Sequence, residues 1–187
     1  MIQVHPSAPS AASDHRREGL RIIIMGVAGC GKSTLARHLA DALELTFIEG
    51  DQFHPTENIR KMSQGTALDD VDREGWLDRL GLELLSYPDG AVLACSALKR
   101  AYRARLRQAV QQLSFVHLSV TQELANARVQ ARSGGHPFPS SLVASQFATL
   151  EDPLGEERVL QLDGAIEPSV LCARTIQWID ELSLQPA

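Results

Sequence analysis

Short apolar runs alternate with longer amphipathic segments along most of this chain. Runs of the first kind favour β-strands at 21–25, 46–49, 91–95, 114–118 and 158–162. The first and third are apolar nearly throughout, which is typical of central strands in a parallel sheet covered on both faces. The intervening segments have helical periodicity; Leu35, Leu39 and Leu43, for example, recur every four residues. We expect helices at 33–43, around 58–63, and at 73–87, 99–112, 122–132, 141–150 and 168–182.

This alternation of strand and helix predicts an α/β fold with three layers, in which a five-stranded parallel sheet carries helices on both faces. Ligands of such folds bind at the carboxyl ends of the strands. Residues that directly follow a predicted strand are therefore the first candidates for binding and catalysis.

Composition narrows the class of protein. The chain has 187 residues, of which 44% are hydrophobic and 22% charged, with a net charge of −5. These values fit one globular domain, and they argue against nucleic acid or an anionic membrane as the main partner. No apolar run is long enough to span a bilayer. Residues 1–19, rich in Ala, Ser and Pro, lack the apolar segment of a signal peptide and are expected to be a disordered leader before a single domain at 20–187.

The three cysteines have no metal-ligand spacing. An odd, scattered set of this kind is more typical of reduced thiols than of disulfides, so we expect a cytoplasmic protein.

The segment GVAGCGKS at 26–33 fits the phosphate-binding pattern G-x-x-x-x-G-K-[ST]. It follows a predicted strand and precedes a predicted helix, which is the context that the pattern requires. Its glycines permit a tight turn whose N–H groups surround an anion. Lys32 would add a charge at the β- and γ-phosphates, and Ser33 a hydroxyl for Mg²⁺. The expected nucleotide-binding residues are Gly26, Gly29, Cys30, Gly31, Lys32, Ser33 and Thr34.

Two acids, Glu49 and Asp51, follow the second predicted strand. Asp51 could accept the proton of a substrate hydroxyl during phosphoryl transfer, and Glu49 could hold Mg²⁺ through water. No further acid follows the third strand to share that metal. The alternative to these catalytic and metal-binding roles is that Glu49 and Asp51 simply form an acidic turn before a helix.

His54, an acidic run at 69–72 and Arg73 come next. A lone histidine is more often structural than functional. Asp69 and Asp70 could simply form an acid-rich helix start. Arg73 could reach an anionic substrate.

The blocks GDQFHPTENIRKMSQGTALDDVDREGWL, ACSALKRAYRARLR and SQFATLEDP, together with the phosphate-binding loop (P-loop), resemble the gluconokinase family. These are P-loop kinases related to shikimate and nucleoside monophosphate kinases, and the resemblance covers roughly residues 20–182. It implies ATP- and Mg²⁺-dependent phosphorylation of D-gluconate to 6-phospho-D-gluconate, with a homodimer as the usual assembly. Asp51 matches the family acid that engages the substrate hydroxyl, and His54 matches a family histidine that lines the same pocket. Arg73 matches the arginine of the family's D-x-DR element.

A sugar acid needs a cation for its carboxylate, and arginine matches a carboxylate in bidentate fashion. We expect Arg103 to be that cation, with Arg73 second; a basic helix surface is the alternative for Arg103.

Arg128 and Arg132 share a helical face and lead into a mobile lid at about 133–150, so they are expected to act on the transferring phosphoryl group. Two solvated arginines are the alternative.

Three positions depart from the family pattern. Glu49 stands where relatives often have Asp, and Gly75 stands where they usually have proline. An additional glycine precedes His136, a substrate-binding candidate, and leaves its contact partner open.

Two other classes stay open at this point. One is another small-molecule kinase of the same architecture, such as a shikimate or nucleotide kinase. The other is a nucleotide-dependent switch, because DREG at 72–75 fits D-x-x-G. That segment does not follow an apolar strand, however, and the chain has no N-K-x-D sequence to read guanine.

Overall fold

The computed structural model describes residues 19–131 and 141–184. Five strands form one sheet in which all neighbours are parallel, in the order β2-β3-β1-β4-β5. The strands are β1 (Leu20–Met25), β2 (Thr46–Glu49), β3 (Gly90–Ala94), β4 (Ser114–Ser119) and β5 (Val159–Asp163). The predicted fold class is confirmed. Most of the proposed leader and residues 133–140 of the proposed lid lie outside the described residues.

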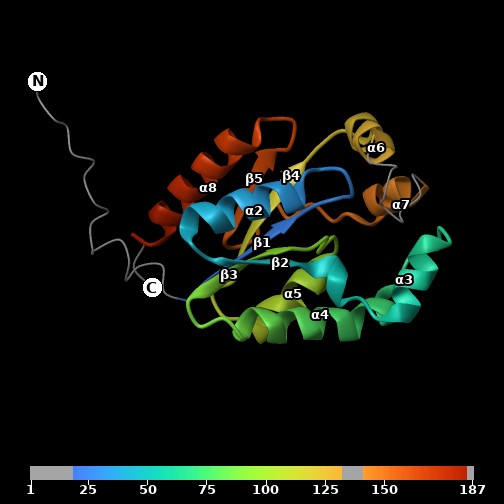
Figure 1. Ribbon diagram of the computed structural model, residues 1–187, viewed down its shortest axis with the longest axis horizontal. Helices are drawn as coiled ribbons and strands as arrows, with labels where there is room; N and C mark the ends of the chain where they lie inside the picture. Colours follow the sequence, from blue (N-terminus) through green and yellow to red (C-terminus); the bar gives the residue numbers. More distant parts are fainter. Residues whose placement is uncertain (1–18, 132–140, 185–187) are drawn as a thin grey trace, which may run out of the picture.

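Helices cover both faces of the sheet (Figure 1). On one face α2 (Lys32–Leu43) packs against α8 (Pro168–Leu182), and on the other α4 (Asp70–Leu85) packs against α5 (Arg100–Ala109). At the carboxyl ends of the strands lie the 3₁₀ turn η1 (Gly50–Phe53), α3 (Thr56–Ser63), α6 (Gln122–Ala131) and α7 (Ser141–Thr149). No helix in the described part of the chain is long and apolar enough to cross a membrane.

The continuous apolar run of β1 is explained by its central position. Ile22 and Ile24 enter the core formed with α2 and α8, whereas Ile23 and Met25 enter the core formed with α4 and α5. All four side chains are fully buried. Burial of each stabilises the fold by roughly 1.5–3 kcal/mol, so a polar residue on either face of this strand would be costly.

Helix α4 begins earlier than its hydrophobic pattern suggested, because the acidic run caps it. Asp72 donates its N–H to the Asp69 carboxylate (2.8 Å), and Asp69 donates its N–H to the Asp72 carboxylate (3.1 Å). This reciprocal capping box satisfies two backbone donors that a helix start otherwise leaves unpaired. The helix-start interpretation is thus correct for Asp69.

The capping box gives a stability prediction. Asp69→Ala removes the acceptor for the Asp72 N–H and should lower the free energy of unfolding by about 1 kcal/mol, measured by urea denaturation. Asp69→Asn is the matched control, because asparagine caps helices as well as aspartate and should change stability little. Equal losses in the two variants would show that the charge of Asp69, rather than the cap, is what matters.

Candidate active site

The loop between β1 and α2 adopts the conformation that a phosphate cradle needs. Gly26, Gly29 and Gly31 have φ angles of 137°, 79° and 107°, which disfavour any side chain. At Gly29 a Cβ would also lie 2.5 Å from the backbone oxygen of Ala125. Gly31 is the N-cap of α2 and provides no side-chain cap, so the first N–H groups of the helix stay available to an anion.

An open cavity of about 80 Å³ lies beside this loop. It collects residues from the P-loop, η1, α3, α4, the end of β3, α6 and α7. The lining residues are Ala28, Gly29, Gly31, Lys32, Ser33, Asp51, His54, Met62, Arg73, Ser96, Val129 and Gln146. Five sequence-predicted functional side chains (Lys32, Ser33, Asp51, His54 and Arg73) are therefore brought together.

The sequence pattern did not single out Met62, Ser96 or Val129 among the lining residues. Only Ser96 had a usable signal, because it follows β3 at the carboxyl edge of the sheet, where ligands of α/β folds bind.

Lys32 and Gln146 both make contacts with the P-loop itself. The Lys32 ammonium donates to the Val27 carbonyl (3.0 Å), within the cradle. The Ala28 N–H donates to the side-chain oxygen of Gln146 (2.6 Å). Because Gln146 belongs to α7, this bond ties a helix within the proposed lid at 133–150 directly to the nucleotide loop.

Glu49 and Ser33 supply two adjacent hard oxygen donors at the mouth of the cradle. Burial raises the pKa of the Glu49 carboxyl, while a hydrogen bond from the Ser33 hydroxyl opposes that shift. Arg37 lies 3.9 Å from the same carboxylate. The described residues contain no group of three or more His, Cys, Asp or Glu that could hold a metal. A cation at Ser33 and Glu49 would therefore need phosphate oxygens and water as its other ligands, as Mg²⁺ usually does.

His54 is held in an apolar stack. Its side chain is 7% exposed and lies face to face with Trp76, with ring centroids 4.1 Å apart. Trp76 in turn donates its indole N–H to the Gly50 carbonyl (2.9 Å) at the start of η1. Burial lowers the pKa of His54 to about 4, against the opposing charge of Asp51, so the ring is neutral near pH 7.

Arg73 is a buried cation with no carboxylate partner among the described residues. It is 9% exposed, and its Nε is buried without a hydrogen-bond partner in the described part of the chain. Its guanidinium lies 5.7 Å from the ring centroid of Tyr102. The nearby Asp70 carboxylate is already engaged, because it accepts bonds from Tyr102 and from Lys99. Since buried charges are normally paired, Arg73 is placed to receive an anionic ligand.

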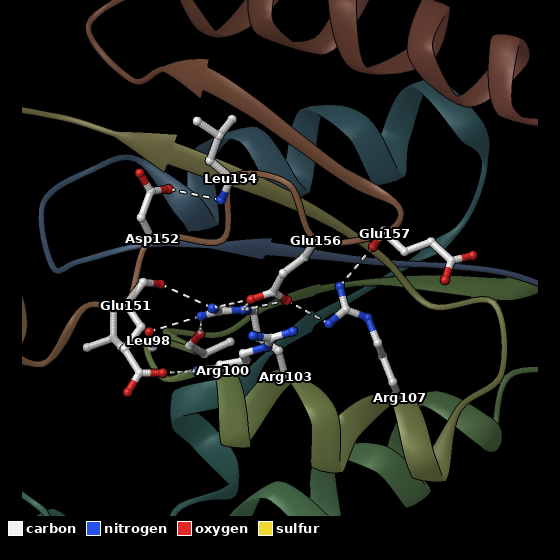
Figure 2. A network of polar contacts seen from close by, with 10 residues as sticks. Leu98, Arg100, Arg103, Arg107, Glu151, Asp152, Leu154, Glu156 and Glu157 are labelled. Atoms are coloured by element: carbon white, nitrogen blue, oxygen red, sulfur yellow. Dashed lines mark hydrogen bonds and ion pairs between the residues drawn. The ribbon is translucent and has the colours of Figure 1, made fainter.

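Arg103, predicted to bind the substrate carboxylate, lies outside the described cavity and is engaged elsewhere. It is fully buried and is not among the cavity residues. Its guanidinium donates to the Ala97 carbonyl (2.9 Å). It also donates to the Leu98 carbonyl (2.9 Å) and to the Glu156 carboxylate (2.6 Å), as Figure 2 shows. Arg107 binds the other oxygen of that carboxylate (2.7 Å). Arg103 therefore anchors the loop after β3 to the segment before β5, and Arg73 is the better candidate for a substrate carboxylate.

Arg128 lies behind the P-loop rather than in the cavity. Its Nη1 donates to the Gly164 carbonyl (2.8 Å) and, more weakly, to those of Gly29 and Cys30 (3.4 Å each). A contact with the transferring phosphoryl group requires the side chain to leave these carbonyls, and stays a prediction. Arg132 and His136 lie outside the described residues.

Together the fold and the cavity define a P-loop small-molecule kinase: a triphosphate cradle faces an acid and an unpaired cation across one cavity. The model of the family described as an AAA domain matches residues 22–154. A gluconokinase from Gluconobacter oxydans is 45% identical over 161 residues, which cover 83% of this chain and 89% of that protein. The thermoresistant gluconokinase of Escherichia coli is 37% identical, over 84% of this chain and 91% of its own. The chain belongs to the gluconokinase family.

Solved structures agree with this assignment. The crystal structure of a gluconokinase from Sinorhizobium meliloti superposes with a TM-score of 0.81 at 41% identity, covering 89% of this chain and 95% of that one. A shikimate kinase from Acinetobacter baumannii has a TM-score of 0.61 at 22% identity, covering 92% of this chain and 99% of its own, and thus shares the fold.

The buried Arg103–Glu156 pair predicts a large stability effect. Arg103→Met leaves the Glu156 carboxylate short of its main partner and should cost about 3 kcal/mol of unfolding free energy in urea denaturation. Arg105→Met is the matched control, because its ion pair with Asp78 is solvent-exposed and should matter by less than about 1 kcal/mol. A small and equal loss in both variants would contradict the anchoring role of Arg103.

The lowered pKa of His54 predicts a pH dependence of stability. As pH falls from 7 to 5, the unfolded chain protonates this histidine while the folded chain does not, so the folded state loses stability. Taking an unfolded pKa of 6.5 and a folded pKa of about 4, the loss from this residue is about 2 kcal/mol at pH 5. His54→Phe should remove that part of the pH dependence in thermal or urea unfolding. The same slope in both proteins would show that His54 is not responsible.

Proposed function

We propose that this protein transfers the γ-phosphoryl group of ATP to the terminal hydroxyl of D-gluconate, giving 6-phospho-D-gluconate. The main observation behind this proposal is that the P-loop, Asp51 and Arg73 line the same cavity, and that the Arg73 Nε has no hydrogen-bond partner among the described residues. Membership of the gluconokinase family supports the choice of acceptor. An anionic polyol matches a cavity that offers both a buried guanidinium and polar hydrogen-bonding groups.

Each residue has a distinct role in the proposed reaction. The P-loop amides and Lys32 hold the triphosphate and offset the charge of the transferring group. Arg73 binds the carboxylate of the sugar acid. Asp51 orients the terminal hydroxyl and accepts its proton as the oxygen attacks phosphorus.

The residues present also fit a bound magnesium ion. Ser33 and Glu49, the latter through water, would hold Mg²⁺ beside the β- and γ-phosphates, where it would neutralise phosphate charge. Arg128, Arg132 and His136 complete the proposal as residues that act when the lid closes over both substrates.

Assembly and location are part of the proposal. A homodimer is expected from the family resemblance and can be checked by light scattering. A cytoplasmic location is supported by three cysteines, all of them free thiols.

The direct test is a coupled ADP assay with ATP, Mg²⁺ and a panel of acceptors: D-gluconate, shikimate and nucleoside monophosphates. We expect gluconate to be the preferred acceptor and the product to be phosphorylated at the terminal carbon. Turnover of shikimate or a nucleotide without turnover of gluconate would overturn the proposed substrate while keeping the kinase class.

A variant test addresses the proposed base. Asp51→Asn keeps the shape of the side chain but cannot accept the proton, so kcat should fall by about a hundredfold or more with little change in KM for ATP. Asp41→Asn, the same substitution on the exposed side of α2, is the control and should keep wild-type kinetics. Near-normal kcat in Asp51→Asn would assign the carboxylate a purely binding role.

A further inference from the structure

Asn58 connects His54 to the start of α4. It is a buried asparagine on α3, 4% exposed, whose amide nitrogen donates to the backbone carbonyl of Asp72 (2.7 Å). The same nitrogen lies 3.5 Å from Nδ1 of His54. Lys61, one turn further along α3, holds the Asp72 carboxylate (2.6 Å) and so clamps α3 against α4.

These contacts determine the orientation of the Asn58 amide. A carbonyl oxygen can only accept a hydrogen bond, so the group facing the Asp72 carbonyl must be the NH₂ of Asn58 rather than its oxygen. The second hydrogen of that NH₂ then points to His54. Since an amide NH₂ can only donate, Nδ1 of His54 must be the acceptor and carries no proton.

A neutral imidazole has one protonated nitrogen, which here must be Nε2. No hydrogen bond to Nε2 is found among the described residues, and the ring lines the cavity beside Asp51 and Arg73. The stack on Trp76 holds the plane of the ring. The proton on Nε2 is therefore available to a ligand.

We infer that His54 is a fixed hydrogen-bond donor, through Nε2–H, to an oxygen of the acceptor substrate, and that Asn58 is the positioning residue that sets this tautomer. The identity of the acceptor as a sugar acid rests on the proposed function, but the tautomer does not.

The assigned tautomer has two consequences for the roles of the cavity residues. A protonated Nε2 cannot take a proton, so His54 is excluded as the base and Asp51 keeps that role. Because the His54 ring is neutral, it favours a hydroxyl oxygen of the substrate as its hydrogen-bond acceptor. The substrate carboxylate is then left to Arg73.

The tautomer can be measured in the resting protein. In protein labelled with ¹⁵N-histidine, long-range ¹H–¹⁵N spectra distinguish protonated from unprotonated ring nitrogens. The His54 signals are assigned by their loss in His54→Phe. At pH 7 we expect an unprotonated Nδ1 and a protonated Nε2 for His54. A protonated Nδ1, or rapid averaging of the two nitrogens, would overturn the inference whatever the substrate is.

The positioning role is tested by Asn58→Asp. A carboxylate accepts rather than donates, so it should move the proton of the neutral ring from Nε2 to Nδ1, and the ¹⁵N spectrum should change accordingly. Loss of the directed Nε2–H bond should lower kcat/KM for gluconate about tenfold, while KM for ATP stays the same. Gln64→Glu adds the same charge at the exposed end of α3 and is the control, with wild-type spectrum and kinetics expected.

A second pair of variants keeps the test decisive if Asn58→Asp fails to fold. His54→Gln retains an N–H donor, whereas His54→Phe retains only the stacking surface. Greater kcat/KM for gluconate in His54→Gln than in His54→Phe supports donation. Equal values in the two, or a wild-type kcat/KM in a folded Asn58→Asp with a reversed tautomer, would overturn it. Failure of every variant and of the wild type to phosphorylate gluconate would instead refute the proposed function, and the ¹⁵N result would stand independently.

Discussion

The site depends on one constraint: a tight loop must leave several backbone N–H groups unpaired and aim them at one point. Unpaired buried amides are normally costly, and a helix start leaves four of them. Glycine at 26, 29 and 31 lets the chain make this turn, and the close approach of the Ala125 backbone leaves no room for a side chain at 29. A triphosphate removes the cost by accepting those bonds, so the loop is stabilised by its ligand.

On the side of the cavity formed by α4, the arrangement depends on how buried charges are paired. The α4 start collects a capping box, an ion pair with α3 and hydrogen bonds from α5, and every acid in this cluster has a partner. Arg73 follows on the same helix, and its buried Nε has no hydrogen-bond partner in the described part of the chain. Keeping a desolvated guanidinium unpaired is unfavourable for folding, and an anionic substrate offsets that cost when it binds. The neighbouring neutral His54 adds a directed donor without adding charge to the cavity.

Particular residues show how far prediction from sequence reached. The strands and most helices were found within a few residues, because each is either a fully apolar run or a clear helical repeat. The structure brings Lys32, Ser33, Asp51, His54 and Arg73 to one cavity, and their roles stay predictions. Motif spacing and position after a strand pointed to Lys32, Ser33 and Asp51, whereas His54 and Arg73 were matched through the family resemblance. Arg103 was predicted to bind the substrate, but the structure places it outside the cavity. An arginine one turn into a helix near the site gives no sign of direction, and only the fold shows that it turns inward to Glu156 and away from the cavity.

The sequence alone determined the class of fold, the nucleotide cradle and the family, because all three are recognisable from contiguous residues and short-range periodicity. Tertiary structure decided which arginine stays free, that Gln146 reaches the P-loop, and that Asn58 sets the tautomer of His54. These outcomes depend on pairings between residues far apart along the chain, and on burial, which decides whether a charge is paired. Neither can be read from local pattern, because the same side chain is a ligand, an anchor or a solvated group according to what packs against it.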